Sequence, residues 1–165
     1  VEEIVMMGRY PHFNLRPTRL DQEICLDAMK KMEVDAFAGR DYLTLSGGEK
    51  QRVQFARVLA QVWKKTERET KYLFLDEAVS HLDLKHQQQL LNEAKEHAKK
   101  GSVVICILHD LNLAIAYADR LLLMKDGGIR YELEDPASIT SAIIKEVFEV
   151  EAVILSHHQR PVIAY

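Results

Sequence analysis

A serine and two glycines begin a segment of the chain with a strong helical pattern. The segment reads LTLSGGEKQRVQFARVLAQ over residues 43–61. Ser46 and Glu49 have the spacing of a capping box, in which the hydroxyl accepts a bond from a first-turn amide and the carboxylate reaches back. Gly47 and Gly48 cost this turn roughly 1 kcal/mol each relative to alanine. Bare backbone at the positive end of a helix dipole binds anions, phosphate above all. An ordinary capped helix explains these four residues equally well.

Two adjacent acidic residues follow the next short apolar run. The run reads YLFL over residues 72–75, and Asp76 and Glu77 come directly after it. The carboxyl ends of the strands are where open parallel sheets bind ligands. An aspartate at such a strand end can hold Mg²⁺, directly or through water, and the next carboxylate can orient or deprotonate a water molecule. A polar turn after a strand is the alternative interpretation of these two residues alone.

Two further features follow along the chain. SHLD at residues 80–83 leads into a helix that Asp83 is placed to cap, and His109 follows the apolar run VVICIL at residues 103–108. A lone histidine at a strand end is more often structural than catalytic. The four features in this order favour one shared function over four unrelated turns.

The four features resemble the ATP-binding cassette, the nucleotide-binding subunit of ABC transporters. LSGGE with QRV behind it is similar to the signature motif of that family, YLFLDE to its Walker B strand, SHLD to its D-loop and LHD to its switch-histidine loop. The order and spacing of all four agree. The resemblance runs along essentially the whole chain.

The resemblance implies a nucleotide-binding role for the start of the signature helix. Ser46, Gly47 and Gly48, with Glu49 beside them, would bind the γ-phosphate of ATP held by the opposite subunit. The two subunits would form a head-to-tail dimer, so ATP and a second copy of the ATP-binding subunit are the implied cofactor and partner. A phosphate presented by another subunit needs a helix end without side chains, which two glycines provide.

The resemblance also implies roles for the acidic residues and the histidine. Asp76 would serve Mg²⁺, and Glu77 would be the general base or the group that orients water. His109 would contact the γ-phosphate, and Asp83 would link the two subunits. The family usually has proline and threonine after the glutamate, whereas this chain has alanine and valine at residues 78–79. This change loosens the turn that aims Glu77.

The elements that must position these residues show two kinds of pattern. Up to about residue 40 the pattern is helical, and Ile24, Ala28 and Met32 lie at steps of four on one face. The next helix is the one that Ser46 caps. The pattern then changes to short apolar runs, which suit strands buried on both faces of a parallel sheet. These runs lie at residues 72–75, 103–108 and 121–124.

The segments between the runs predict a crossover helix and a hairpin. Asp83 is placed to cap the helix after the first run, and Gly101 to end it. The inner stripe of this helix is predicted to be Leu84, Leu91, Ala94 and Ala98. A strand, a helix and a strand in this order form a parallel crossover. Beyond the third run, KDGGIRYELE is typical of a tight turn into another strand, and PASITSAIIKEVF of a helix begun by Pro136.

Patterns and resemblance together predict the α/β class, as the C-terminal part of an ABC-type P-loop NTPase domain. Residues 1–63 are expected to form the helical signature subdomain, and residues 64–165 a partial RecA-like parallel sheet with flanking helices. The P-loop pattern G-x-x-x-x-G-K-[ST] occurs nowhere in the chain, which begins beyond the place where that loop and the glutamine loop would stand. We expect a fragment that alone neither binds ATP tightly nor hydrolyses it, and that self-associates through an unpaired apolar sheet edge.

The composition argues against several classes of protein. A chain of 165 residues that is 47% hydrophobic can bury a real core. Its net charge of −3 includes no basic excess that would attract nucleic acid, so Lys50, Arg52 and Arg57 are predicted to form a solvated helix face. Cys25 and Cys106 are far apart in sequence and are expected to be free thiols in a reducing compartment, with Cys106 buried. No apolar run approaches the roughly 18 residues that span a bilayer.

The flanking segments indicate a group within the family. VMMGRYPHF resembles the segment after the glutamine loop in importers of haem, iron-siderophore complexes and cobalamin, and RVQFARVLAQVW with LHDLNLAIAYADR resembles the haem importers most. The resemblance implies a peripheral subunit on the cytoplasmic face of the bacterial inner membrane. Its partners would be transmembrane permease subunits, with residues 9–13 near that contact, and indirectly a periplasmic or surface substrate-binding protein. The alternatives are a soluble ATPase of DNA repair or translation and a non-catalytic chain that only associates.

Overall fold

The structure is a computed structural model that describes residues 1–63, 70–157 and 160–165. These residues form two compact units, Val1–Ile107 and Leu108–Tyr165. The predicted domain boundary between residues 63 and 64 falls beside residues outside the described part, and it stays a prediction. None of the helices in the described ranges has the length and hydrophobicity needed to span a bilayer.

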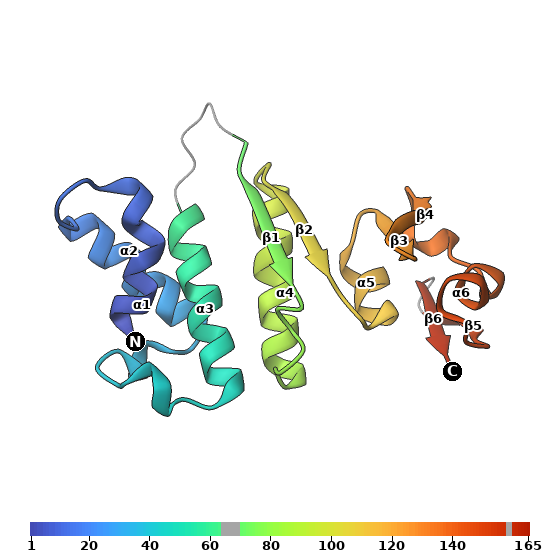
Figure 1. The fold of residues 1–165 in the computed structure, drawn as a ribbon, viewed down its shortest axis with the longest axis horizontal. Helices are drawn as coiled ribbons and strands as arrows, with labels where there is room; N and C mark the ends of the chain where they lie inside the picture. Colours follow the sequence, from blue (N-terminus) through green and yellow to red (C-terminus); the bar gives the residue numbers. More distant parts are fainter. Residues whose placement is uncertain (64–69, 158–159) are drawn as a thin grey trace. The chain divides into compact units, whose positions relative to one another are not determined.

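The first unit begins with helices that pack on one another (Figure 1). In chain order they are α1 Glu2–Met6, η1 Met7–His12, α2 Arg19–Lys31, η2 Asp35–Phe37, η3 Tyr42–Thr44 and α3 Gly47–Val62, where η denotes a 3-10 helix. The predicted inner face of α2 is confirmed, because Ile24, Ala28 and Met32 are all buried. Helix α2 packs on α3, whose own buried side includes Val53 and Leu59.

A buried ion pair joins three of these elements. Arg9 of η1 donates from Nε to Asp21 Oδ1 of α2 at 2.9 Å and from Nη1 to the carbonyl of Ala60 in α3 at 2.8 Å. Asp21 also accepts from the backbone N–H and the hydroxyl of Thr18, which caps α2. Burial alone would raise the pKa of Asp21, but the bonds from Thr18 and Arg9 and the Arg9 charge outweigh it and lower that pKa. Loss of either residue would therefore leave the other as a buried charge without a counter-charge, which is unfavourable.

Gly8 allows η1 to lie directly on α3. A Cβ atom at this position would stand 2.1 Å from the carbonyl oxygen of Arg57, well inside van der Waals contact. Any other residue would push η1 away from α3 and disturb the neighbouring Arg9 pair.

The first unit continues with a parallel strand pair and the helix between the two strands (Figure 1). These elements are β1 Tyr72–Asp76, α4 Leu84–Lys99 and β2 Val103–Ile107. Strands β1 and β2 pair in parallel, which confirms the predicted crossover. Asp83 caps α4 by accepting from the N–H of His86 at 2.9 Å, and Gly101 follows the helix with a φ of 85°. Both predicted ends of this helix are therefore confirmed.

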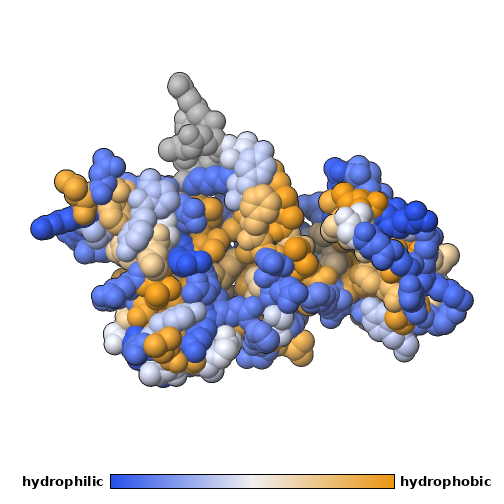
Figure 2. All heavy atoms as spheres, in the orientation of Figure 1, coloured by the Kyte–Doolittle hydropathy of each residue, from blue (hydrophilic) through white to orange (hydrophobic). Residues whose placement is uncertain are grey.

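The prediction that these strands are buried on both faces is wrong. Leu73 and Leu75 of β1 are buried, but Phe74 between them is 68% exposed. Helix α4 packs on the sheet, while hydrophobic residues of β1 and β2 gather on the surface in Figure 2. The exposed ones are Tyr72, Phe74, Val103, Ile105 and Ile107. A continuous apolar run makes both faces of a strand apolar, but burial requires a packed layer on each face.

The inner stripe of α4 differs from the prediction at its two ends. Leu91 and Ala94 are buried as expected, together with Leu90, but Ala98 is half-buried and Leu84 is 76% exposed. Leu84 lies seven residues before Leu91 and so shares its face. It is also the first residue of α4, so its exposure reflects its place along the helix and not its direction about the axis.

The described residues of the second unit form two antiparallel strand pairs and two α-helices. In chain order these and a 3-10 turn are α5 Leu111–Tyr117, β3 Leu121–Lys125, β4 Gly128–Leu133, η4 Pro136–Ser138, α6 Ser141–Phe148, β5 Val153–His157 and β6 Arg160–Ala164. The tight turn predicted in KDGGIRYELE is confirmed and lies at Asp126 and Gly127, which have positive φ, 53° and 76°. The placement of residues 121–124 in a parallel sheet is wrong, because this two-residue turn makes β3 pair with β4 antiparallel.

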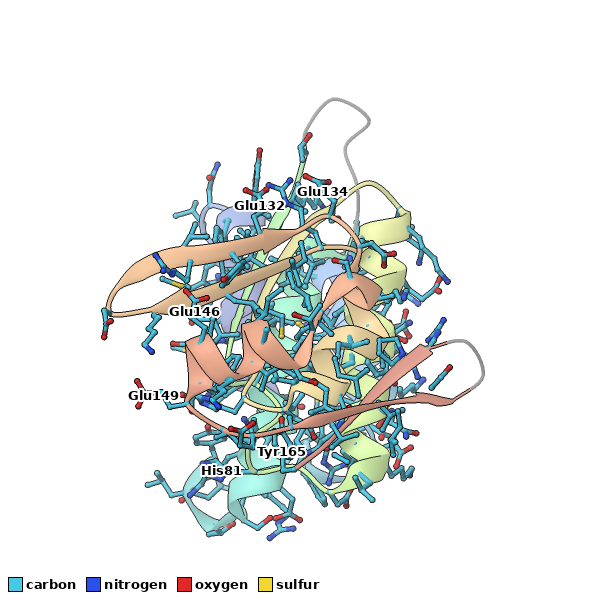
Figure 3. The ribbon with its side chains drawn as sticks, turned by 90° about the vertical axis from the view of Figure 1, so that its right-hand side faces the viewer. His81, Glu132, Glu134, Glu146, Glu149 and Tyr165 are labelled. Atoms are coloured by element: carbon cyan, nitrogen blue, oxygen red, sulfur yellow. The ribbon has the colours of Figure 1, made fainter. Side chains whose placement is uncertain are left out.

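Helix α6 begins later than predicted. Pro136 starts only η4, and α6 begins after Thr140, whose hydroxyl caps its first turn. Glu146 of α6 accepts from Arg130 Nε at 2.7 Å and from the hydroxyl of Tyr131. These bonds tie α6 to β4, with Glu146 on the side of the helix that faces the hairpin (Figure 3).

Candidate functional site

The predicted capping box at the start of α3 is present. The N–H of Glu49 donates to Ser46 Oγ at 3.3 Å, and the N–H of Ser46 donates to Glu49 Oε2 at 2.7 Å. The bond from the Ser46 backbone, followed by that from its hydroxyl, lowers the pKa of Glu49. Ser46 and Gly47 are exposed. The positive end of the helix dipole therefore opens to the surface, as an anion site requires.

The two glycines have different surroundings. A Cβ atom on Gly47 would meet no atom within 4 Å, whereas a Cβ atom on Gly48 would stand 3.1 Å from the carbonyl oxygen of His81. Gly48 thus favours the close approach of α3 to the segment after β1, since any side chain there would make this contact tight. No packing contact among the described residues requires glycine at position 47. A ligand that approaches the backbone at this position would account for it.

The turn after β1 presents the two predicted acidic residues. Asp76 ends the strand and Glu77 follows it with a φ of 48°, in the left-handed region, so the chain turns off the strand at Glu77. Both residues are exposed. The Glu77 carbonyl accepts from Ser80 N at 3.1 Å, from Ser80 Oγ at 2.9 Å and from Gln51 Nε2 of α3 at 3.0 Å. The turn that lacks a proline is held by these hydrogen bonds.

Sequence reasoning missed Gln51 and Ser80. Gln51 is the first residue of QRV in the signature stretch, and Ser80 is the first residue of SHLD, so both lie inside motifs that the sequence analysis identified. No spacing rule relates residue 51 to residue 77, because their contact depends on how α3 packs beside β1. A serine three residues after Glu77 was the signal available in the sequence, since serine closes turns by bonding to backbone.

Asp83 has a role within its own chain. Its Oδ1 accepts from the His86 N–H at 2.9 Å and lies 2.8 Å from His86 Nδ1. The bond from the His86 backbone is the largest cause of the lowered pKa of Asp83. The carboxylate is 66% exposed. Capping thus accounts for Asp83 by itself, and its implied link to a second subunit stays a prediction.

His109 belongs to the second unit, whereas the other predicted site residues belong to the first. It is exposed and directly precedes Asp110, which caps α5 by accepting from Asn112 N at 2.8 Å. The first unit brings the start of α3 next to the turn after β1. The role of His109 toward a phosphate stays a prediction.

The structure adds contacts to two expectations about basic residues. Arg52 is half-buried, and its Nη1 donates to the carbonyls of Met32 and Glu33 at the end of α2, at 3.1 and 2.9 Å. It supplies a positive charge where the helix dipole is negative. Arg9, expected near a membrane subunit, is buried in the pair with Asp21. A contact at residues 9–13 would have to use their exposed members, such as Tyr10.

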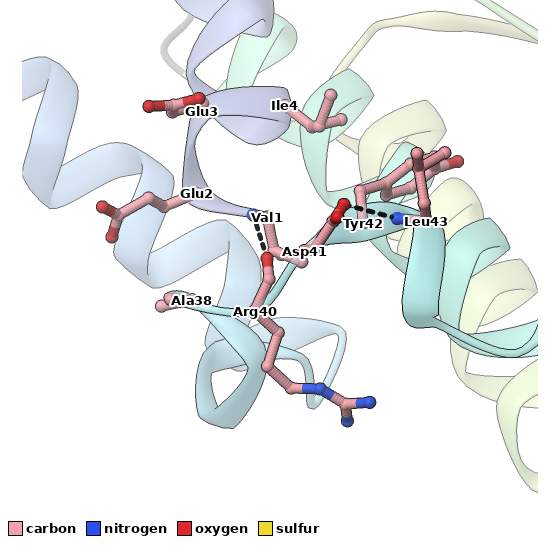
Figure 4. Close-up of a pocket in the computed structure, with 10 residues that line it drawn as sticks. Val1, Glu2, Glu3, Ile4, Ala38, Arg40, Asp41, Tyr42 and Leu43 are labelled. Atoms are coloured by element: carbon pink, nitrogen blue, oxygen red, sulfur yellow. Dashed lines mark hydrogen bonds between the residues drawn. The ribbon is translucent and has the colours of Figure 1, made fainter.

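A pocket is lined by other residues of the first unit (Figure 4). It is lined by Val1, Glu2, Glu3, Ile4, Ala38, Gly39, Arg40, Asp41, Tyr42 and Leu43, and the amino group of Val1 donates to the Arg40 carbonyl beside it. It includes none of the predicted site residues. Among the described residues, no three His, Cys, Asp or Glu side chains gather closely enough to hold a metal ion. Cys25 is a buried free thiol, and Cys106 is free but only half-buried.

The sequence is similar to those of hemin import ATP-binding proteins. No family model matches the chain. It is 44% identical over 157 residues to the hemin import ATP-binding protein of Gloeobacter violaceus and 45% identical over 164 residues to that of Hahella chejuensis. The chain is homologous to the ATP-binding cassettes of ABC transporters. These matches cover 95% and 98% of this chain but 57% and 62% of the two relatives, so it spans about three fifths of their length.

Solved structures agree on the fold. An ABC transporter assigned to the metal-chelate type, in an inward-facing conformation, matches with a TM-score of 0.77 and 25% identity, over 99% of this chain and 66% of that one. A dimeric bacterial ABC transporter cassette matches with a TM-score of 0.65 and 24% identity, over 78% of this chain and 53% of that one. The predicted α/β cassette fold is therefore confirmed.

Proposed function

We propose that this chain is part of the ATP-binding subunit of an ABC importer, which couples ATP hydrolysis to the uptake of haem or another iron chelate. One observation carries the proposal above the others. Gly47 stands bare at an exposed helix start, with no packing reason within the described residues. The 44% and 45% identity to hemin import proteins over nearly the whole chain supports the choice of cargo.

The proposed chemistry is carried out by the start of α3, by Glu77 in the turn after β1 and by His109. Ser46, Gly47 and Gly48, with Glu49 closing the cap, bind the γ-phosphate of a nucleotide held by a second copy in a head-to-tail dimer. Glu77 takes a proton from the attacking water or orients it. His109 of the second unit contacts the γ-phosphate.

ATP and Mg²⁺ are the cofactors of this proposal. Asp76 is exposed at the strand end and fits as a single carboxylate ligand to Mg²⁺. Magnesium commonly takes one or two protein carboxylates and completes its shell with water and substrate phosphates, so one carboxylate from this chain suffices. The ion supplies charge neutralisation on the phosphates when bound.

The proposed subunit works peripherally, on the cytoplasmic face of the bacterial inner membrane. Transmembrane permease subunits carry the cargo, and a substrate-binding protein delivers it to them from outside. Asp83, exposed at the start of α4, links the two copies of the subunit. Nucleic acid has no part in this proposal, since the chain carries 22 basic against 25 acidic residues.

The decisive test uses the complete cassette, meaning this chain together with a segment that carries the phosphate-binding loop. The complete cassette and its permease subunits are reconstituted in liposomes, and ATP hydrolysis and uptake of haem are measured. We expect hydrolysis that haem-loaded binding protein stimulates and that Glu77→Gln abolishes while ATP still binds. Hydrolysis unaffected by Glu77→Gln would contradict the role of this residue, and uptake of cobalamin or a siderophore in place of haem would reassign the cargo.

The 165-residue chain alone is proposed to be inactive. It contains no G-x-x-x-x-G-K-[ST] loop, so little in it can hold the β- and γ-phosphates. Titration calorimetry with Mg-ATP tests this point. Micromolar binding to the chain alone would refute it.

A further inference from the structure

Two glutamine side chains hold the turn after β1. Gln51 Nε2 of α3 donates to the carbonyl of Glu77 at 3.0 Å, and Gln87 Nε2 of α4 donates to the carbonyl of Val79 at 3.1 Å. Both glutamines are half-buried, and Val79 is buried. The turn is therefore fixed from outside, by one side chain from each of two helices.

Glu77 is the part of this turn that most needs support. Its φ of 48° is left-handed, a conformation that non-glycine residues adopt only when their surroundings enforce it. The next residue is Ala78, whose methyl group restricts the backbone little. The bonds that converge on the Glu77 carbonyl, from Ser80 and Gln51, supply the enforcement.

The start of α3 is built so that Gln51 can reach this carbonyl. Gly48 and Gln51 are three residues apart and so lie on one side of the helix. Gly48 brings that side to the turn, because a Cβ there would stand 3.1 Å from the His81 carbonyl oxygen. A larger residue at position 48 would move α3 away and lengthen the bond from Gln51 to Glu77.

Packing alone does not account for a glutamine at position 51. Its Oε1 is buried and accepts no hydrogen bond within the part of the chain that the structure describes. A buried acceptor without a partner is unfavourable, and an apolar side chain of the same length would avoid it. The hydrogen bond from Nε2 to the Glu77 carbonyl offsets this unfavourable burial and is the reason for an amide at this position.

We infer that Gln51 is a positioning residue for Glu77: its amide fixes the left-handed backbone at Glu77 and so directs the carboxylate at the attacking water. The inference rests on the proposed function, in which Glu77 acts on that water. It adds a connection within one chain. The first turns of α3 that present Ser46, Gly47 and Gly48 to the nucleotide also hold Glu77. A change in the conformation of this helix start would therefore also change the position of Glu77.

The test measures steady-state ATP hydrolysis by the complete cassette. Gln51→Leu keeps the size of the side chain and removes the donor, and Gln51→Glu replaces the donor by an acceptor. Gln54→Leu is the matched control, since Gln54 is also a half-buried glutamine of α3 but donates to the Tyr42 hydroxyl at 2.8 Å, away from the turn.

We expect both Gln51 variants to lose roughly 10- to 100-fold in kcat, the cost of a misdirected general base, while KM for ATP changes less than about twofold. The Gln54 variant should keep its kcat. Amide hydrogen exchange gives the readout that a general loss of stability would not: in Gln51→Leu the N–H of Ser80 should exchange faster, while the amides of α3 keep their protection.

The possible failures are distinct. A kcat for Gln51→Leu within about twofold of the unsubstituted cassette, or an equal loss in Gln54→Leu, would overturn the inference and leave the proposed function intact. A loss expressed only in KM would overturn it too. If the unsubstituted cassette hydrolyses no ATP, the proposed function fails, and the positioning role fails with it.

Discussion

Alanine at position 47 separates what the fold requires from what a ligand requires. Gly47 is the first residue of α3 and does not have a positive φ, and a Cβ atom there meets nothing within 4 Å. Alanine can therefore adopt the native conformation without a clash. It should stabilise the protein by roughly 0.4–1 kcal/mol, because a chain with alanine at this position loses less conformational entropy on folding than a chain with glycine.

The same substitution should damage activity. If a phosphate approaches the backbone of Gly47, a methyl group in its path removes a contact of the kind that stabilises developing negative charge, worth about 100-fold or more in rate. Urea unfolding and ATP hydrolysis are measured on the same preparation of the complete cassette. We expect higher stability and lower turnover from a single variant.

Gly48→Ala is the matched comparison. Its Cβ would stand 3.1 Å from the His81 carbonyl oxygen, so the turn after β1 must shift by a few tenths of an ångström. This variant should gain less stability than Gly47→Ala, or lose some. If Gly47→Ala is more stable and still hydrolyses ATP within about twofold of the unsubstituted protein, then no anion uses this backbone, and the reasoning from bare glycine to phosphate is refuted.

Three further predictions concern the rest of the first unit. Asp21→Asn leaves the buried Arg9 without its counter-charge and should lower the free energy of unfolding at pH 7 by about 3–5 kcal/mol in urea melts. Because folding lowers the pKa of Asp21 below 3.8, this difference should be full above that pH and shrink as the pH falls below it; a difference that grows in acid would contradict the pairing. Burial raises the pKa of Cys25 from 9.0 to about 11, so its thiolate, and its rate of reaction with a disulfide reagent at pH 8, should be roughly 100-fold lower than in the unfolded chain. The exposed apolar residues of β1 and β2 should make the 165-residue chain self-associate, and a monodisperse monomer in light scattering would argue against this.

Features set by a few neighbouring residues were predictable from the sequence. The capping box needs only Ser46 and Glu49, and the hairpin turn needs only Asp126 and Gly127. In each case the bonds or dihedral angles that define the element lie within four residues of one another. The strand-end position of Asp76 was predictable for the same reason, because an apolar run and the polar residues after it are adjacent.

Features that depend on packing between distant segments were not predictable. The exposure of Phe74 could not be inferred, because an apolar run tells which faces of a strand are apolar but not which are covered. Arg9 and Asp21 lie twelve residues apart, and no spacing rule relates them, yet they form a buried ion pair. Gly8 is needed only because η1 crosses α3 at that point.

Gln51 belongs to this second class, although it stands inside the most recognisable stretch of the sequence. A motif read along the chain assigns its residues to one shared ligand, and by that logic Gln51 would serve the nucleotide as Ser46 does. A helix has two sides, however, and residues three or four apart return to the same one. Gly47 opens to the surface, whereas Gly48 and Gln51 face the turn that carries Glu77. The stretch therefore contains two functions on two sides of one helix, and the second becomes visible only when the strand beside it is in place.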